Sequence, residues 1–155
     1  MKKVSVLVMA LFFTVLCNFS ASAQEEYTWD DYGLKFSVPS DFKESTSDGE
    51  KFEGSSNRGK IYLFGLYPIK DENITNDNLA EAVNAMAKES KMKVTDAHEI
   101  DFNGFEGYCA EGTIEGKPAF FACMLDPNGD LNFIITLLHD NADAAIKLVK
   151  SIKKK

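Results

Sequence analysis

The chain has 155 residues, with 24 acidic side chains against 17 basic ones and a formal net charge of −7 at pH 7. An acidic chain repels phosphate backbones, so nucleic acid is a poor partner. Hydrophobic residues make up 45% of the sequence and aromatic residues 12%, which excludes a disordered chain and predicts a folded core.

The first 23 residues have the three parts of a secretory signal. A basic start, Met1-Lys2-Lys3, is followed by an apolar run over residues 4–19 and by the small residues Ala21-Ser22-Ala23. The run is shorter than the stretch of roughly 20 apolar residues that a spanning helix needs. We therefore predict a signal peptide over residues 1–23, cleaved after Ala23.

Residues 24–155 are expected to form a single α+β domain. Cleavage removes Lys2 and Lys3 and no acidic residue, so 15 basic side chains would face 24 acidic ones, a formal charge of −9. We predict a secreted or periplasmic protein with no stable membrane span. The short, lysine-rich leader favours a Gram-negative bacterium.

Four strands are expected before the first helix, and two of them are weakly indicated. Residues 27–32 and 51–55 are the weak candidates, and residues 34–38 alternate apolar and polar side chains as a half-buried strand does. Residues 60–69 are apolar on both faces, which predicts a strand near the sheet centre with both sides covered. The polar stretch 41–50 is interpreted as a loop.

A helix over residues 79–92 follows, because Leu79, Val83, Met86 and Ala87 recur at helical spacing. Residues 94–140 then predict a meander of four antiparallel strands joined by three tight turns. The turns are Asn103-Gly104, Glu115-Gly116 and Asp126-Pro127-Asn128-Gly129. Asn-Gly favours a type I′ turn, which needs positive φ at both central residues.

Asp140 or Asn141 should cap a second helix that faces inward with Ala145, Ile146, Val149 and Ile152. The predicted order is β-β-β-β-α-β-β-β-β-α. We expect an α+β fold with a single antiparallel sheet of six to eight strands and a helix packed on each face.

The segment Tyr32-Gly33-Leu34-Lys35-Phe36-Ser37-Val38-Pro39-Ser40-Asp41-Phe42 resembles the opening of the PsbP/Mog1/DcrB-like group. That opening is a glycine, an alternating strand, a proline and then an aromatic residue. The order of early strands, helix, meander and closing helix is similar as well. The resemblance implies an α/β sandwich of accessory or uncharacterised envelope type, and it brings no shared catalytic residues.

Cys109 and Cys123 would be the two cysteines left after cleavage, on adjacent strands of the meander. A three-residue loop at Glu115-Gly116-Lys117 would place them directly opposite each other and allow a disulfide in an oxidising compartment. A two-residue loop at Glu115-Gly116 would place them on opposite faces as separate buried thiols. The sequence leaves both alternatives open.

No metal site is predicted. His98 and His139 are interpreted as isolated strand residues, since zinc needs three or four ligands with recognisable spacing. Asp126, Asn128 and Asp130 resemble the start of a calcium loop. However, the glycine is fourth rather than sixth, and Leu137 stands where the final glutamate is needed, so a hairpin turn is expected.

The aromatic residues of the first half support two interpretations. Most are expected in the core, but Trp29, Tyr32 and Phe42 could instead line an exposed groove for a peptide or glycan.

The function is predicted by exclusion. The sequence has neither a Gly-x-Ser-x-Gly elbow nor a phosphate-binding Gly-x-x-x-x-Gly-Lys, and no cofactor is expected. We predict a secreted or periplasmic, non-enzymatic accessory protein that binds an unknown envelope protein or a small ligand. The alternatives are a hydrolase whose carboxylates converge only in the fold, and an envelope stress protein without a discrete site.

Overall fold

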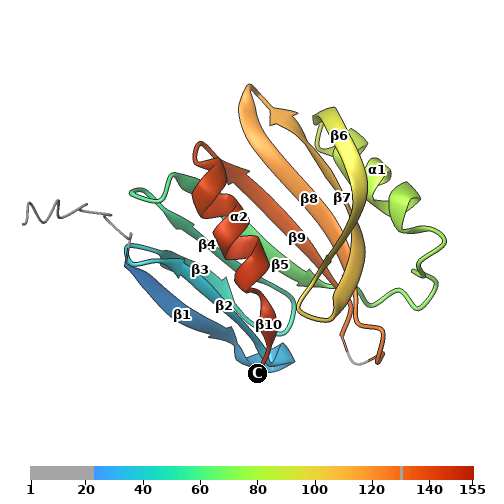
Figure 1. The fold of residues 1–155 in the computed structure, drawn as a ribbon, viewed down its shortest axis with the longest axis horizontal. Coiled ribbons are helices and arrows are strands. Elements are labelled where there is room, and N and C mark those ends of the chain that lie inside the picture. The colour runs from blue at the N-terminus through green and yellow to red at the C-terminus, as the bar shows by residue number, and fades with distance from the viewer. Residues whose placement is uncertain (1–22, 130) are drawn as a thin grey trace, which may run out of the picture.

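The computed structural model describes residues 23–129 and 131–155, so the predicted leader lies outside the described residues except for Ala23. The fold is α+β, as predicted, with two antiparallel sheets and two α-helices in the described ranges (Figure 1). The early strands are β1 (Gln24–Trp29), β2 (Leu34–Pro39), β3 (Lys43–Ser47), β4 (Phe52–Ser56) and β5 (Ile61–Pro68). A short 3₁₀ turn, η1 (Asp30–Tyr32), joins the first two. The later elements are α1 (Leu79–Glu89), β6 (Lys93–Phe102), β7 (Phe105–Ile114), β8 (Lys117–Leu125), β9 (Phe133–His139), α2 (Ala142–Ser151) and β10 (Lys153–Lys154).

The large sheet has seven strands in the order β3-β4-β5-β9-β8-β7-β6. Strand β9 is at its centre, where both faces are covered. Phe133, Ile135 and Leu137 are buried in the main core, while Ile134 and Leu138 pack on the other side. Strand β5, which was expected near the sheet centre from its apolar residues on both faces, lies beside β9.

The meander turns form as predicted. Asn103 and Gly104 have φ of 49° and 86°, and Glu115 and Gly116 have φ of 50° and 80°. Both pairs form two-residue loops, which pair Phe102 with Phe105 and Ile114 with Lys117. These backbone values are those of type I′ turns, whose twist matches that of the strands they join.

A second sheet, β1-β2-β10, covers part of the large sheet, so the prediction of a single sheet is wrong. The chain leaves β2 at Pro39, whose carbonyl accepts a hydrogen bond from Phe42 N at 2.9 Å, and this turn carries it into the large sheet at β3. Core aromatic residues pack between the layers, with Phe36 of β2 in edge-to-face contact with Phe52 and Phe64.

The two helices lie on opposite sides of the large sheet (Figure 1). Helix α1 packs on β7 and β8, where Leu79 and Val83 contact Ala110 and Cys123. Helix α2 packs against β2 and β9 and shares its side of the large sheet with the small one. A helix therefore packs on each face of the large sheet, but the predicted layout of a single sheet covered by the two helices is not what the structure has.

Strand β3 was predicted as loop. Its five residues are polar, and none of them is buried, so hydrophobic periodicity carries no signal there. The strand forms because its backbone pairs with β4 at the edge of the large sheet. Among the described residues, no helix is long and apolar enough to cross a membrane.

Candidate functional site: a groove beside helix α2

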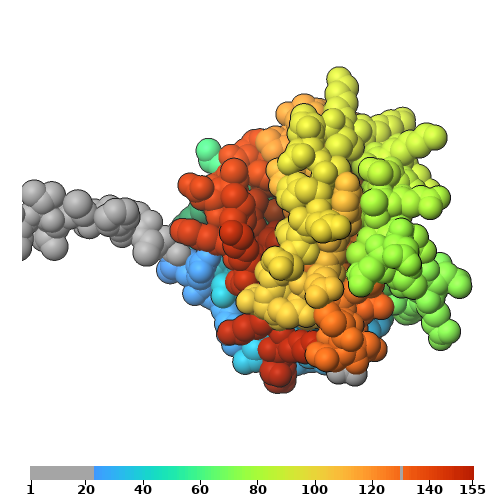
Figure 2. Space-filling model, turned by 45° about the vertical axis from the view of Figure 1, so that its right-hand side comes forward, coloured from blue at the N-terminus to red at the C-terminus, as the bar shows by residue number. Residues whose placement is uncertain are grey.

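The candidate site is a groove between α2 and strands β6 to β9, which we call the α2 groove. Its volume is about 640 Å³. Figure 2 shows the red surface of α2 and the yellow surface of β6 on either side of a hollow. The floor is apolar and the rim is polar; the floor includes Ile100, Phe120, Leu137 and Val149, and the rim includes His98, Glu111, His139, Asp140 and Lys150.

The groove exists because α2 is held toward the small sheet and leaves β6 to β8 uncovered. Asn141 caps the first turn of α2, accepting a hydrogen bond from Ala144 N at 3.2 Å. At the other end, Ser151 Oγ accepts a hydrogen bond from Ser37 N of β2 at 2.8 Å. The helix is thus fixed at both ends, and the floor stays open beside it.

At the β6–β7 end of the groove, a cluster of metal-type ligands lies on one face of the hairpin. His98 pairs directly with Cys109, and Asp96 pairs directly with Glu111. Directly paired residues of antiparallel strands share a face. The distance from His98 Nε2 to Cys109 Sγ is 3.5 Å, and from His98 Nδ1 to Asp96 Oδ2 it is 3.1 Å.

A β-bulge at Thr95 ends this run of direct pairs. The register of β6 against β7 shifts between Val94 and Asp96, and Thr95 Oγ1 donates to the Glu111 carbonyl at 3.2 Å. Asp96 lies opposite Glu111 in the same register that pairs His98 with Cys109, and it shares a face with His98 because the two are two residues apart on one strand. Bulges commonly re-aim side chains beside functional sites.

Asp96 contacts His98, and His98 contacts Cys109, in the order in which the acid, base and thiol of a cysteine hydrolase are arranged. However, Cys109 is 0% exposed, and burial raises the pKa of its thiol to about 11, with the Glu111 and Asp96 carboxylates adding to the increase. A thiol is an effective nucleophile only as an accessible thiolate. Cys109 is therefore not arranged for nucleophilic attack.

His139 lies on the rim of the α2 groove, at the end of β9. Its Nδ1 atom is buried and has no hydrogen-bond partner among the described residues. Burial lowers the pKa of the imidazole, and the Asp140 and Glu111 carboxylates oppose that shift. Burial thus favours the neutral imidazole, and His139 lines the groove although its Nδ1 atom is buried.

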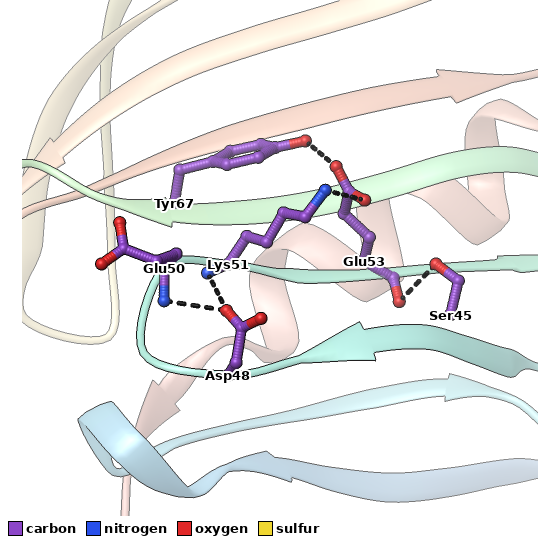
Figure 3. A network of polar contacts seen from close by, with 6 residues as sticks. All are labelled: Ser45, Asp48, Glu50, Lys51, Glu53 and Tyr67. Atoms are coloured by element: carbon purple, nitrogen blue, oxygen red, sulfur yellow. Dashed lines mark hydrogen bonds and ion pairs between the residues drawn. The ribbon is translucent and has the colours of Figure 1, made fainter.

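On the opposite side of the large sheet, β3 to β5 carry a polar network rather than a groove (Figure 3). Tyr67 donates a hydrogen bond to Glu53 Oε1 at 2.6 Å, and Lys51 Nζ lies 2.9 Å from Glu53 Oε2. Burial, and then the bond to Glu53, raise the pKa of Tyr67 to about 12. The side chains satisfy one another, which suits a structural role.

The structure resolves the two alternatives for the cysteines. Cys109 pairs with Ala122 and Tyr108 pairs with Cys123, so the two thiols lie on opposite faces of the sheet. Both are free and buried. The disulfide alternative is wrong, and the alternative based on a two-residue loop is confirmed.

The predicted aromatic groove is also wrong. Trp29 is 0% exposed and Phe42 is 5% exposed, so neither can line an exposed surface. Trp29 Nε1 donates to the Asp48 carbonyl at 2.7 Å, which satisfies its one polar atom inside the core. Tyr32 is partly exposed, and its hydroxyl donates to the Gly49 carbonyl at 2.6 Å. The buried rings join the two sheets instead of forming a site.

The Asp126 turn is a hairpin turn, as predicted. Gly129 N donates to the Asp126 carbonyl at 2.8 Å, and Gly129 has a φ of 81°. The Asp126 side chain is buried, accepts a hydrogen bond from Asn128 N at 3.0 Å and forms an ion pair with Lys154. Its carboxylate holds the turn against β10.

The two histidines were predicted to be isolated, but His98 and His139 line the same groove. A local signal for the His98 cluster was present. Counting back from the two-residue Asn103-Gly104 turn pairs Phe102 with Phe105 and, four pairs further, His98 with Cys109. The approach of His139 depends on the pairing of β8 with β9 and on the position of α2, which no local pattern indicates.

The structure has two antiparallel sheets. Helix α2 packs against β2 and β9, and helix α1 packs on the opposite face of the large sheet, on β7 and β8. This arrangement is a PsbP-like fold. The chain is similar to the solution structure of cyanobacterial PsbP (CyanoP) from Synechocystis sp. PCC 6803, with a TM-score of 0.57 and 11% sequence identity. The likeness covers 89% of this chain and 96% of that one, and it extends to the fold alone. The resemblance predicted from the sequence is thereby confirmed for the fold.

A crystal structure from Bacteroides thetaiotaomicron VPI-5482 is similar at a TM-score of 0.49 and 12% identity, over 85% of this chain and 48% of that one. No family model matches the chain, and no curated protein matches it.

Proposed function

We propose that this protein is a non-enzymatic accessory protein of the bacterial envelope that binds an amphipathic small molecule, or a short segment of a partner protein, in the α2 groove. The observation that carries the proposal is the groove itself. Its volume of about 640 Å³ lies within the range of ligand sites, roughly 300–1,000 Å³. An apolar floor with a few polar groups at the rim is the usual composition of such sites.

The chemistry of the rim indicates how a ligand would be oriented. The buried His139 Nδ1 has no partner among the described residues and lies beside an apolar floor. A ligand with an apolar body and a polar end group would place the body on Phe120 and Leu137 and direct the end group to His139 or Lys150. Such a ligand keeps its polar end group among the polar side chains of the rim and its apolar body against the apolar floor.

The alternative of a hydrolase with converging carboxylates has less support. It calls for two buried carboxyl groups facing each other in a cleft. Among the described residues, the one buried carboxylate is Asp126, which pairs with Lys154 outside the groove. The third alternative, an envelope protein without a discrete site, calls for a surface without a pocket, whereas the described surface has the α2 groove.

Binding is tested with an anilinonaphthalene sulfonate dye, which has an apolar body and an anionic end group. We expect saturable fluorescence with one dye per chain. Ile146 is 51% exposed on the groove rim, and Ile146→Lys should weaken binding about tenfold by removing apolar contact. Val94→Lys is the matched control, because Val94 is 44% exposed and does not line the groove. Equal losses in the two variants would contradict a groove site.

The envelope location is tested separately by fractionating the native host and sequencing the N-terminus of the processed protein. We expect the processed chain to begin at Gln24 and to fractionate with the periplasm or the culture medium. A cytoplasmic, uncleaved chain would overturn the location without bearing on dye binding.

A further inference from the structure

We propose that His98, Cys109 and Glu111 form a site for Zn²⁺ or a similar divalent transition metal on the β6–β7 hairpin. One ligand atom from each residue lies within 4.8 Å of the other two. Imidazole nitrogen, thiolate sulfur and carboxylate oxygen are the three ligand types that protein zinc sites use. The proposal does not depend on the groove ligand proposed above.

The distance between the two anchoring ligands is that of a tetrahedral centre. Zn–N of roughly 2.05 Å and Zn–S of roughly 2.3 Å at a tetrahedral angle separate nitrogen from sulfur by roughly 3.6 Å. The distance from His98 Nε2 to Cys109 Sγ is 3.5 Å. These two ligands come from one directly opposed pair on two strands, so the sheet fixes their spacing. Glu111 is exposed, and rotation of its side chain brings its carboxylate onto the metal.

Asp96 completes the arrangement as a positioning residue. Its Oδ2 atom lies 3.1 Å from His98 Nδ1, a position from which it can accept the proton of that nitrogen. This leaves Nε2 as the nitrogen with a free lone pair, and Nε2 is the atom that faces Cys109. A carboxylate behind a histidine ligand fixes its tautomer and orientation in many zinc sites.

The charge around the cluster also favours a cation. Asp96 and Glu111 are directly opposed acidic side chains, and like charges in that position repel each other. Among the described residues, no lysine or arginine forms an ion pair with either of them. His98 and Glu111 also line the α2 groove, so a metal held between them keeps one coordination position toward the groove, open to water.

The test is a Co²⁺ titration of the purified chain, made without a polyhistidine tag and stripped of metal with a chelator. We expect one Co²⁺ per chain, a thiolate-to-cobalt charge-transfer band, the strong visible bands of four-coordinate cobalt, and displacement by Zn²⁺. If the preparation keeps the leader, Cys17→Ser is added so that no thiol from that segment contributes.

Variants assign the ligands. Cys109→Ser should abolish the charge-transfer band, and His98→Ala and Glu111→Gln should each weaken Zn²⁺ binding at least tenfold. Two matched controls should keep the affinity within twofold. Cys123→Ser alters the buried cysteine of the opposite face, and Glu106→Gln alters an exposed glutamate of β7.

His98 and Glu111 are exposed, so their variants remain informative even if Cys109→Ser fails to fold. Absence of the charge-transfer band in the unmodified chain would overturn the proposal. So would a band that survives Cys109→Ser in a folded protein, or six-coordinate cobalt spectra that show binding to surface carboxylates alone.

Discussion

Cys109 and Cys123 lie on adjacent strands, yet their side chains point to opposite faces of the large sheet. Cys109 faces α2 and the main core, whereas Cys123 faces α1 and lies near Met86. A disulfide between them would require β7 and β8 to slip by one residue, and such a slip turns every side chain of the strand to the wrong face. The register is therefore a barrier to oxidation, even in an oxidising compartment.

We predict that both thiols stay reduced in protein purified from its native host without reductant. Alkylation followed by peptide mass spectrometry should label Cys109 and Cys123 slowly in the folded chain and completely after denaturation, because both are buried. Burial also raises the pKa of each thiol to about 11, which keeps the unreactive protonated form at neutral pH. A peptide linked between the two cysteines before denaturation would contradict this register.

The bulge at Thr95 depends on Gly112. A Cβ atom at this position would lie 2.1 Å from the Lys93 carbonyl oxygen, which belongs to the backbone and cannot turn away. We expect Gly112→Ala to destabilise the fold by about 1–3 kcal/mol, as overpacking does. Denaturant unfolding measures the change. Gly49→Ala is the control, since a Cβ at that position meets nothing within 4 Å, and its effect should stay within about 0.5 kcal/mol. Equal stabilities of the two variants would mean that β6 moves freely at the bulge.

Asp41 ties the β2–β3 turn to the end of β4. It accepts hydrogen bonds from Ser56 Oγ and from Arg58 N, the latter at 2.7 Å, and these bonds lower the pKa of the carboxyl. A lowered folded-state pKa gives stability that is present above the unfolded value, about 3.9, and is lost as the pH falls through the folded value.

Asp41→Asn should therefore cost about 1 kcal/mol at pH 7, reduced by solvent screening, and the cost should shrink toward pH 3. Urea unfolding of both chains across this range measures the difference. Glu25→Gln removes an exposed carboxylate of β1 and should show no comparable trend. A cost for Asp41→Asn that stays constant down to pH 3 would show that the charge makes no contribution.

Tyr67 should ionise late. Its pKa is raised to about 12, first by burial and then by its bond to Glu53. A raised folded-state pKa gives stability that is full below the unfolded value, roughly 10, and is lost as the pH rises toward 12. Tyr67→Phe should cost about 1 kcal/mol at pH 8, because it removes one hydrogen bond to a charged group.

That cost should fall as the pH rises from 10 to 12, and the tyrosinate absorbance of the unmodified chain should show one late-ionising residue that the variant lacks. Tyr27→Phe is a suitable comparison, because the Tyr27 hydroxyl makes a long, 3.5 Å bond to the Phe42 carbonyl. If the late ionisation disappears in Tyr27→Phe and persists in Tyr67→Phe, it belongs to Tyr27 and the prediction is wrong.

Asp96→Asn tests the positioning role in the proposed metal site. An asparagine of similar shape can no longer hold the His98 tautomer as a carboxylate does. We expect Zn²⁺ affinity to fall about tenfold while the thiolate-to-cobalt band stays at its wavelength, since Cys109 still binds. Asp101→Asn, on the same strand but outside the α2 groove, should leave the affinity unchanged. An unchanged affinity in Asp96→Asn would leave that carboxylate with no part in the site.

The meander could be predicted because its signals are local. The Asn103-Gly104 turn fixes φ, loop length and register within a few residues. The Glu115-Gly116 signal located the second turn but left its loop length open, and the structure shows a two-residue loop. The second sheet could not be predicted in this way. Strand β10 consists of two exposed lysines, Lys153 and Lys154, which carry no periodicity at all. Strand β3 is likewise an exposed polar edge, held by its neighbour's backbone rather than by its own side chains.

The candidate site likewise has one part that local sequence signals predict and another part that depends on long-range contacts. The pairing of His98 with Cys109 follows from a turn that the sequence shows, although a residue-by-residue search for metal-ligand spacing passes over it because the two ligands are far apart in the chain. The groove itself depends on the long-range contact of α2 with β2, which Ser37 and Ser151 fix from opposite ends of the described chain. Burial of Trp29 and Phe42 depends on the same long-range closure of the two sheets.

Strand β2 pairs on one edge with β1 and on the other with β10, where Lys153 and Lys154 meet Lys35 and Leu34 and Lys155 N donates to the Gly33 carbonyl at 2.8 Å. During synthesis, that second edge of β2 has no partner until α2 and the residues after it have emerged from the ribosome. Under the export in an unfolded state that we propose, this delay would keep the sandwich from closing early. Until then, this unpaired edge of β2 is a place where the growing chain is open to pairing with another strand.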